Sequence, residues 1–290
     1  MERRPGSGTY LGPALRARRG AFGLLIPGLG STDIFEPICA EMARSAQAAR
    51  YDLLWGDSPE GGPGVDVTRA EELCRKHVDR RVSGVFFAPL EFAEDGGASN
   101  RRIAETLAAA GIPVVLLDRD LEPFPRRSGF DLVGIDNLAG GCALAQHLLE
   151  RGCRKIRFVS RPGSAPTVEA RLAGARLAAE VRPLAGARLV DEVLRSGADG
   201  AICANDATAA ELMRGLLARG VRIPRDLKLA GFDDVRYAAL LPVPLTTLRQ
   251  PCRDLGAAAV RAMLERTETP ALPARQILLS GTLVARASTR

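Results

Sequence analysis

Two adjacent carboxylates, Asp233 and Asp234, end one apolar strand of the predicted fold, and Arg249-Gln250-Pro251 closes the next. Carboxylate oxygens accept hydrogen bonds from hydroxyl groups, and an amide such as Gln250 both donates and accepts. In open α/β sheets, polar ligands bind beyond the carboxyl ends of the strands. The spacing therefore predicts a site that recognises a small polar molecule.

Polar residues follow other predicted strands in the same way, and several of these residues are charged. They are Glu91, Asp118-Arg119, Asp136-Asn137, Arg161 and Asn205-Asp206. Because parallel strands bring their carboxyl ends to one edge, these donors and acceptors are expected together, in a mixture that suits a polyhydroxylated ligand. The alternative is that each Asp or Asn caps the helix after it, a role expected for Asp234.

The elements that must position these residues alternate between short apolar runs and longer amphipathic segments. Strands are predicted at 21–26, 51–55, 84–88, 113–117, 132–135, 155–159, 199–203, 227–230 and within 277–284. Helices are predicted at 34–49, 67–80, 100–110, 138–151, 167–180, 191–195, 207–219 and 255–266. Repeated βα units predict an α/β fold of two doubly wound parallel-sheet lobes with a ligand cleft between them.

Composition narrows the class of protein. The chain has 290 residues, 46% hydrophobic and 26% charged, with no apolar run long enough for a membrane span and no signal sequence, so a cytoplasmic protein is expected. Its six cysteines form no CxxC pair, and we expect neither a metal nor a cofactor. The net charge is +6, and arginines cluster before the first strand, as in a tether to DNA-binding machinery or a solvated tail.

An enzyme is the least favoured class. The first strand is not followed by GxGxxG, and the chain has neither a P-loop lysine motif nor a well-placed Ser/His/Asp set. Asp233 and Asp234 make a poor acid–base pair, because adjacent residues of a strand point to opposite faces. These observations favour recognition without chemistry.

Several segments together resemble the effector-binding module of LacI/GalR transcriptional regulators. They include 27–35, 111–119, 133–137, 171–174, 204–206, 231–237 and 245–251, together with the tail 283–289. The resemblance implies a fold of the periplasmic-binding-protein type that the chain crosses several times. It places 21–153 with 249–274 in an N-terminal lobe, and 154–248 with 275–290 in a C-terminal lobe.

The same resemblance suggests ligand contacts. Asp33 and Phe35 lie in the first strand–helix turn, and Arg171 matches an arginine that binds effector in the family. Asn205, Asp233 and Gln250 match cleft residues, and Asp136 lies near a crossing between lobes. With Glu91 and Arg161 from the strand ends, these residues form the predicted site. Phe35 could instead pack in the core, and Arg171 could lie on a helix surface.

Ahead of the module, residues 4–11 resemble the end of the wing in GntR-type winged helix-turn-helix domains, and 1–20 is interpreted as a basic linker with this remnant. Thr32-Asp-Ile-Phe-Glu-Pro-Ile38 resembles the GntR-headed arabinose repressor (AraR) subgroup. The resemblance implies a homodimer that contacts operator DNA through a winged helix-turn-helix missing from this chain.

The chain departs from the family between Ala179 and Asp191, where neither an additional strand nor a ligand-facing aromatic residue is evident. We therefore expect a shortened C-terminal lobe around 180–191. The leading hypothesis is the sensor of a sugar-responsive repressor, controlled allosterically. The alternative is the solute-binding protein of a sugar transport system, which would share the fold.

Overall fold

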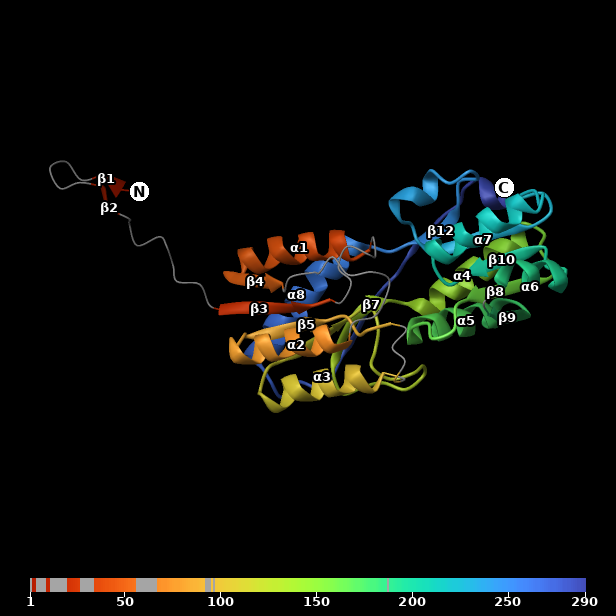
Figure 1. Cartoon of the computed structure of the whole chain (residues 1–290). Helices are drawn as coiled ribbons and strands as arrows, with labels where there is room; N and C mark the ends of the chain where they lie inside the picture. Colours follow the sequence, from red (N-terminus) through yellow and green to blue (C-terminus); the bar gives the residue numbers. More distant parts are fainter. Residues whose placement is uncertain are drawn as a thin grey trace.

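The computed structural model describes residues 2–3, 9–10, 20–26, 34–55, 67–91, 95, 97–186 and 188–290. They form two α/β lobes side by side, each built on a six-stranded sheet (Figure 1). A separate antiparallel pair joins β1 (Glu2–Arg3) to β2 (Thr9–Tyr10). The predicted fold class, two parallel-sheet lobes of the periplasmic-binding-protein type, is confirmed. Among the helices described, none is long and apolar enough to cross a bilayer.

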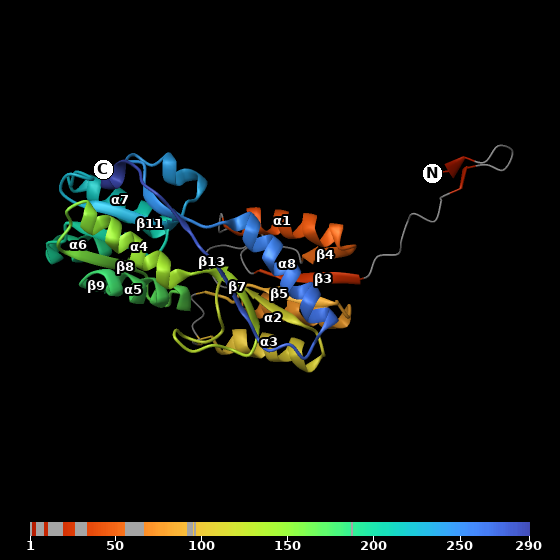
Figure 2. The same cartoon turned by 180° about the vertical axis from the view of Figure 1, so that it is seen from behind.

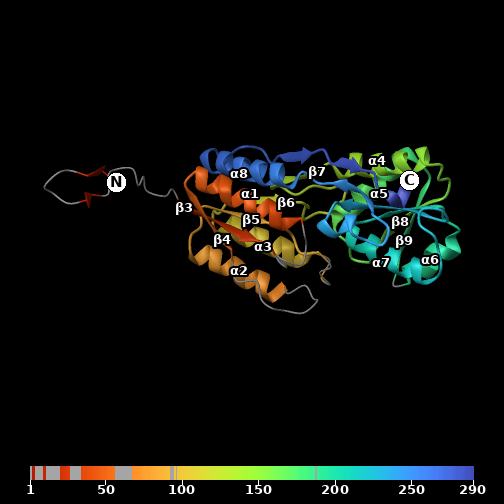
Figure 3. The same cartoon turned by 90° about the horizontal axis from the view of Figure 1, so that it is seen from above.

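Lobe one contains the sheet ordered β13-β7-β6-β5-β3-β4. Its strands are β3 (Gly20–Leu25), β4 (Tyr51–Trp55), β5 (Gly84–Phe87), β6 (Val114–Leu117), β7 (Asp131–Ile135) and β13 (Gln276–Leu279). Helices α1 (Phe35–Ala48) and α8 (Cys252–Glu268) cover one face, and α2 (Val67–Asp79) and α3 (Ala98–Ala109) cover the other (Figure 3). Strands β5 and β6 are buried throughout, as apolar strands covered on both faces must be.

Lobe two contains the sheet ordered β14-β12-β11-β10-β8-β9. Its strands are β8 (Ile156–Ser160), β9 (Val181–Ala185), β10 (Gly200–Cys203), β11 (Lys228–Asp233), β12 (Thr246–Arg249) and β14 (Thr282–Val284). Its helices are α4 (Asn137–Glu150), α5 (Pro166–Ala178), α6 (Leu189–Ser196) and α7 (Asp206–Ala218), with short 3-10 helices at Arg236–Ala239 and Ala287–Thr289. All strand pairs are parallel except β12 with β14.

The described chain crosses between the lobes at Asp136, at Gln250-Pro251 and at Ser280-Gly281, and Figure 2, the view from behind, shows the last crossing on the side nearer the viewer. Two predicted boundaries are therefore wrong. Residues 137–153 were expected in the N-terminal lobe, but α4 packs on α5 of lobe two. Strand β13 was expected in the C-terminal lobe, yet it pairs with β7, because the turn at Gly281 lets one extended segment serve both sheets.

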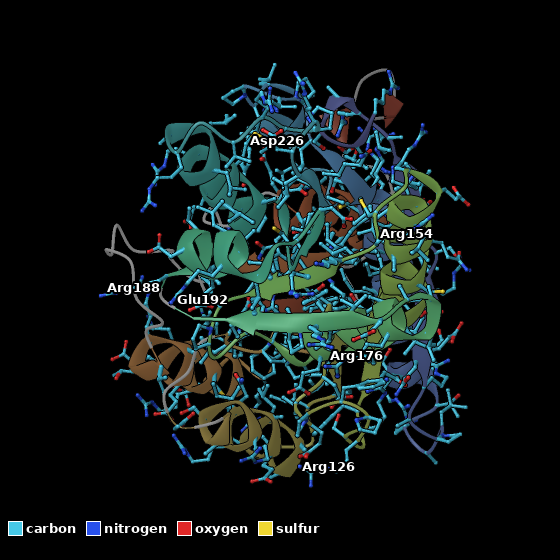
Figure 4. The ribbon with its side chains drawn as sticks, turned by 90° about the vertical axis from the view of Figure 1, so that its right-hand side faces the viewer. Arg126, Arg154, Arg176, Arg188, Glu192 and Asp226 are labelled. Carbon is cyan, nitrogen blue, oxygen red and sulfur yellow. The ribbon has the colours of Figure 1, made fainter. Side chains whose placement is uncertain are left out.

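The expectation that a strand is missing around 180–191 is also wrong, because β9 pairs with β8 along five residues. Pro183 and the charged Arg182 interrupt the apolar pattern by which a strand is predicted from sequence. Both are compatible with an edge strand, where a missing N–H costs no ladder hydrogen bond. Figure 4 views lobe two end-on, with Arg176 of α5 beside β9, and its Nε donates to the carbonyl oxygen of Val181 at 3.2 Å.

Candidate functional site

A cavity lies between the lobes, where carboxyl ends of strands from both sheets face each other. It holds about 610 Å³ of empty space continuous with solvent. Its lining combines carboxylates, guanidinium groups and one amide with a few apolar side chains. The residues are Ile34, Glu91, Asp118 and Arg119 from lobe one, and Thr167, Val168, Arg171, Asn205, Ala207, Asp233, Val235 and Tyr237 from lobe two.

Arg171 is buried in the wall of this cavity and held from three sides. Its Nε donates to Asn137 Oδ1 at 2.7 Å, and its Nη1 donates to the carbonyl oxygen of Ala204 at 2.6 Å. The guanidinium carbon lies 4.4 Å from the centre of the Phe232 ring, a cation–π contact. The remaining amino group, Nη2, lies 3.8 Å from Asp233 Oδ1. Arg171 is therefore a fixed donor in the cavity wall and not a surface helix arginine.

Two glycines set the depth at which α5 holds Arg171. A Cβ on Gly141 would lie 1.9 Å from the carbonyl oxygen of Arg171, and a Cβ on Gly174 would lie 1.8 Å from that of Leu138. Helices α4 and α5 therefore touch backbone to backbone. A side chain at either glycine would push them apart and move the guanidinium.

Asp233 ends β11 with a φ of 109°, in a region that non-glycine residues rarely adopt. Its Oδ1 accepts a 2.7 Å hydrogen bond from Gln250 Nε2. Burial raises the pKa of Asp233, whereas Arg171 and Gln250 oppose the shift. Asp234 does not cap the following helix as predicted. Its carboxylate pairs with Arg249 Nε and Arg286 Nη2, each at 2.6 Å.

The opposite wall is built from Glu91, Asp118 and Arg119. Arg119 donates from Nη1 to Glu91 Oε2 at 2.8 Å and from Nε to Asp118 Oδ2 at 3.0 Å. The amide of Arg119 also donates to the carbonyl oxygen of Leu117 at 2.7 Å, which closes a γ-turn on Asp118, whose φ is 66°. This form of γ-turn is rare and strained. Among the described residues, none hydrogen-bonds to the buried Oδ1 of Asp118.

Glu91 also joins the two lobes directly. Its Oε1 accepts a 3.1 Å hydrogen bond from the amide of Ala165, which immediately precedes α5. Glu91 therefore links Arg119 in lobe one to the amino-terminal end of the helix that carries Arg171.

Two predicted residues combine a capping role with a place near the cleft. Asn205 Oδ1 accepts from the amide of Thr208 at 2.8 Å and caps α7, while the residue also lines the cavity. Asp136 caps α4 by accepting from the amide of Ala139 at 2.9 Å. It lines a different cavity of about 760 Å³ on the crossing side of the lobes. The capping interpretation thus holds for both, and for Asn205 the two roles coexist.

Phe35 and Arg161 lie outside the cavity. Phe35 is 3% exposed within the lobe one core, and the neighbouring Ile34 faces the cavity instead. Arg161 pairs with Glu211, and both side chains are about half exposed. Asp33 falls outside the described residues. Asp118 and Arg119 were expected at the same strand-end edge but were not among the predicted ligand contacts, and both line the cavity.

Residues 145–289 match the family described as periplasmic binding protein-like domain. The chain belongs to this family, as an effector-binding domain of the LacI/GalR type.

Relatives match over nearly the whole chain. The ribose operon repressor of Bacillus subtilis (strain 168) is 28% identical over 287 residues, which cover 92% of this chain and 80% of that protein. A crystal structure of a LacI family transcriptional regulator from Enterococcus faecalis V583, with bound ribose, is 26% identical with a TM-score of 0.75. That match covers 93% of this chain and 98% of that chain.

A crystal structure of transcription regulator GntR from Chromobacterium violaceum is 28% identical with a TM-score of 0.71. The match covers 93% of this chain and 99% of that chain. These similar proteins are transcription regulators, which confirms the prediction of a regulator's ligand-sensing domain and not an enzyme.

Proposed function

We propose that the chain binds a sugar, or a similar small polar effector, between its lobes and thereby controls the DNA binding of a bacterial transcriptional regulator. The observation that carries the proposal is the 3.8 Å separation between Arg171 Nη2 and Asp233 Oδ1 in the cavity wall. A sugar hydroxyl can accept from the first group and donate to the second. Gln250, through Asp233, and Asn205 extend this polar wall, and Asp118 and Arg119 face it from lobe one.

The proposed mechanism is a shift between two arrangements of the lobes. A ligand that contacts both walls stabilises the closed arrangement relative to the open one, by its difference in affinity for the two. In a homodimer, that change alters the spacing of the attached DNA-binding heads. Lobe one is the proposed dimerisation surface, with the outer faces of α1 and α2 as its candidates. Trp55, 58% exposed at the end of edge strand β4, supports an apolar contact there.

We further propose that the regulator acts in the cytoplasm on operator DNA through a winged helix-turn-helix of the GntR type that lies outside this chain. The antiparallel pair of β1 and β2 supports a wing remnant, because Glu2 pairs with Tyr10 and Arg3 with Thr9. The competing proposal, a solute-binding protein for transport, has the same cleft but no need of such a segment.

A thermal-shift screen of pentoses, hexoses and their phosphates tests the effector proposal. D-Ribose is the first probe, because the E. faecalis relative binds it. A ligand at 100 times its Kd stabilises the native state by about 2.7 kcal/mol, which raises the Tm measurably. If no sugar raises the Tm and calorimetry detects no binding at millimolar concentration, the sugar proposal is wrong.

A further inference from the structure

The wall of the cavity in lobe two ends in a strained turn. Asp233 has a φ of 109° and Asp234 a φ of 54°, so two consecutive non-glycine residues adopt positive φ values. Such a conformation is unfavourable for a non-glycine residue and persists only where the surrounding structure holds it. The direction of the Asp233 carboxylate therefore depends on whatever restrains this turn.

The backbone amides of Asp234 and Val235 both depend on the side chain of Asp206. One of them is bonded to it directly and the other through Thr247. The amide of Val235 donates to Asp206 Oδ2 at 3.1 Å. The amide of Asp234 donates to Thr247 Oγ1 at 3.2 Å, and this hydroxyl donates to Asp206 Oδ1 at 2.6 Å. Asp206 thus fixes the turn by one direct bond and by one bond relayed through Thr247.

The surrounding residues are shaped around the Asp206 carboxylate. The residue is fully buried, at 0% exposed, and it begins α7 directly after the cavity residue Asn205. A Cβ on Gly231 would lie 2.3 Å from Asp206 Oδ1, so the glycine of the Gly231-Phe232-Asp233-Asp234 motif makes room for this carboxylate. Burying a polar side chain is costly unless it is hydrogen-bonded, and both side-chain oxygens of Asp206 accept such bonds.

We propose that Asp206 is a positioning residue for effector recognition: it holds the turn that aims Asp233 into the cavity and keeps that turn in register with Asn205. The proposal rests on the proposed function, since it assigns Asp206 a role in the same site. Asp206 acts through Asp233 and does not itself line the cavity, among the residues described.

The test compares Asp206→Ala and Thr247→Val with the unchanged protein. Two quantities are measured: the Kd for D-ribose by calorimetry, and the hydrogen-exchange rates of the Asp234 and Val235 amides without ligand. Asp206→Ala removes both restraints on the turn and is expected to weaken ribose binding about 30-fold. Thr247→Val removes only the relayed restraint and is expected to weaken it about 10-fold. Thr247→Val keeps the side-chain shape, so it remains informative if the alanine variant does not fold. Thr247→Ser retains the hydroxyl group, so this variant should bind ribose with the Kd of the unchanged protein.

Asp199→Asn is the matched control. The Asp199 carboxylate accepts hydrogen bonds from the backbone amides of Arg154 and Lys155, each at 2.8 Å. Asp199 immediately precedes β10, whereas Asp206 follows it. The control should lower stability without changing the Kd or the exchange of Asp234 and Val235. Faster exchange at both amides in Asp206→Ala, and at Asp234 in Thr247→Val, supports the proposal even if ribose proves not to be the ligand. Unchanged exchange in these variants would overturn it, whereas a lack of ribose binding by the unchanged protein counts only against the choice of effector.

Discussion

Arg171 Nη2 lies 3.8 Å from Asp233 Oδ1, close enough for an ion pair and too far for a direct hydrogen bond. The other contacts of both side chains prevent them from moving closer, because Asn137 and Ala204 hold the guanidinium and Gln250 holds the carboxylate. A donor and an acceptor thus remain apart in the same wall. A hydroxyl group placed between them can satisfy both.

Arg171→Lys should weaken effector binding about 100-fold, because a lysine keeps the charge but cannot reach Asn137, Ala204 and the ligand together. Calorimetric titration with the sugar found by thermal shift measures this loss. Arg176→Lys on the same helix is the control, since Arg176 contacts Val181 away from the cavity. Equal affinities for the Arg171 and Arg176 variants would show that Arg171 is not a ligand contact.

Glu91→Ala should favour a more open arrangement of the lobes without ligand, because it removes the hydrogen bond from the Ala165 amide across the cleft. Small-angle X-ray scattering should then give a larger radius of gyration than for the unchanged protein, with recovery when the effector is added. Glu105→Ala, on an exposed face of α3, controls for loss of a carboxylate from lobe one. Identical scattering curves for the Glu91 variant and the unchanged protein would contradict the bridging role.

Arg161→Ala should leave the effector Kd within about twofold of its original value, and should change the free energy of unfolding by about 0–1 kcal/mol, as expected for an exposed ion pair. The reason is that Arg161 pairs with Glu211 at the surface. The same calorimetric titration checks it. A loss of affinity comparable to that of Arg171→Lys would mean that Arg161 turns into the cleft when the ligand binds.

Most of the fold was predictable, because strands such as Val114–Leu117 are continuous apolar runs and the helices between them have strong periodicity. Two features were not. Strand β9 carries Arg182 and Pro183, and its strand character comes from pairing with β8, which is a tertiary contact. The switch of sheets between β13 and β14 depends on backbone space at Gly281, where a Cβ would lie 2.7 Å from Leu248 Cδ2.

The site residues that could be predicted from the sequence are those that reach the cavity because they lie at the end of a strand. Asn205 and Asp233 directly follow or end parallel strands, and the structure brings them together with Arg171. Between Ile34 and Phe35, only the rotation of the first helix decides which side chain faces the cavity, and that rotation is set by packing of α1 on α8. The support of Asp233 by Asp206 and Thr247 joins residues 41 positions apart, which no local pattern specifies.

The free energy of unfolding should decrease by about 1–2 kcal/mol as the pH rises from about 6.5 to about 8. Burial, followed by the charge of Asp233, raises the pKa of Asp206 to about 8. The folded state therefore retains a proton that the unfolded chain has lost above its ordinary pKa of 3.8. The stabilisation is complete below that value and is lost progressively up to about pH 8. Urea unfolding at several pH values measures the slope, and Asp206→Asn should flatten it. A slope that persists in this variant would assign the titration to another group.

Calorimetric titration of Asp233→Ala beside Asp226→Ala shows whether Asp233 belongs to an effector site. Asp226 is a carboxylate of the same lobe that pairs with Arg222 on the exposed surface. We expect the screened sugar to bind and stabilise the Asp226 variant, whereas the Asp233 variant should remain folded and neither bind the sugar nor show a ligand-dependent rise in Tm. An unchanged Kd and an unchanged melting shift in Asp233→Ala would contradict it.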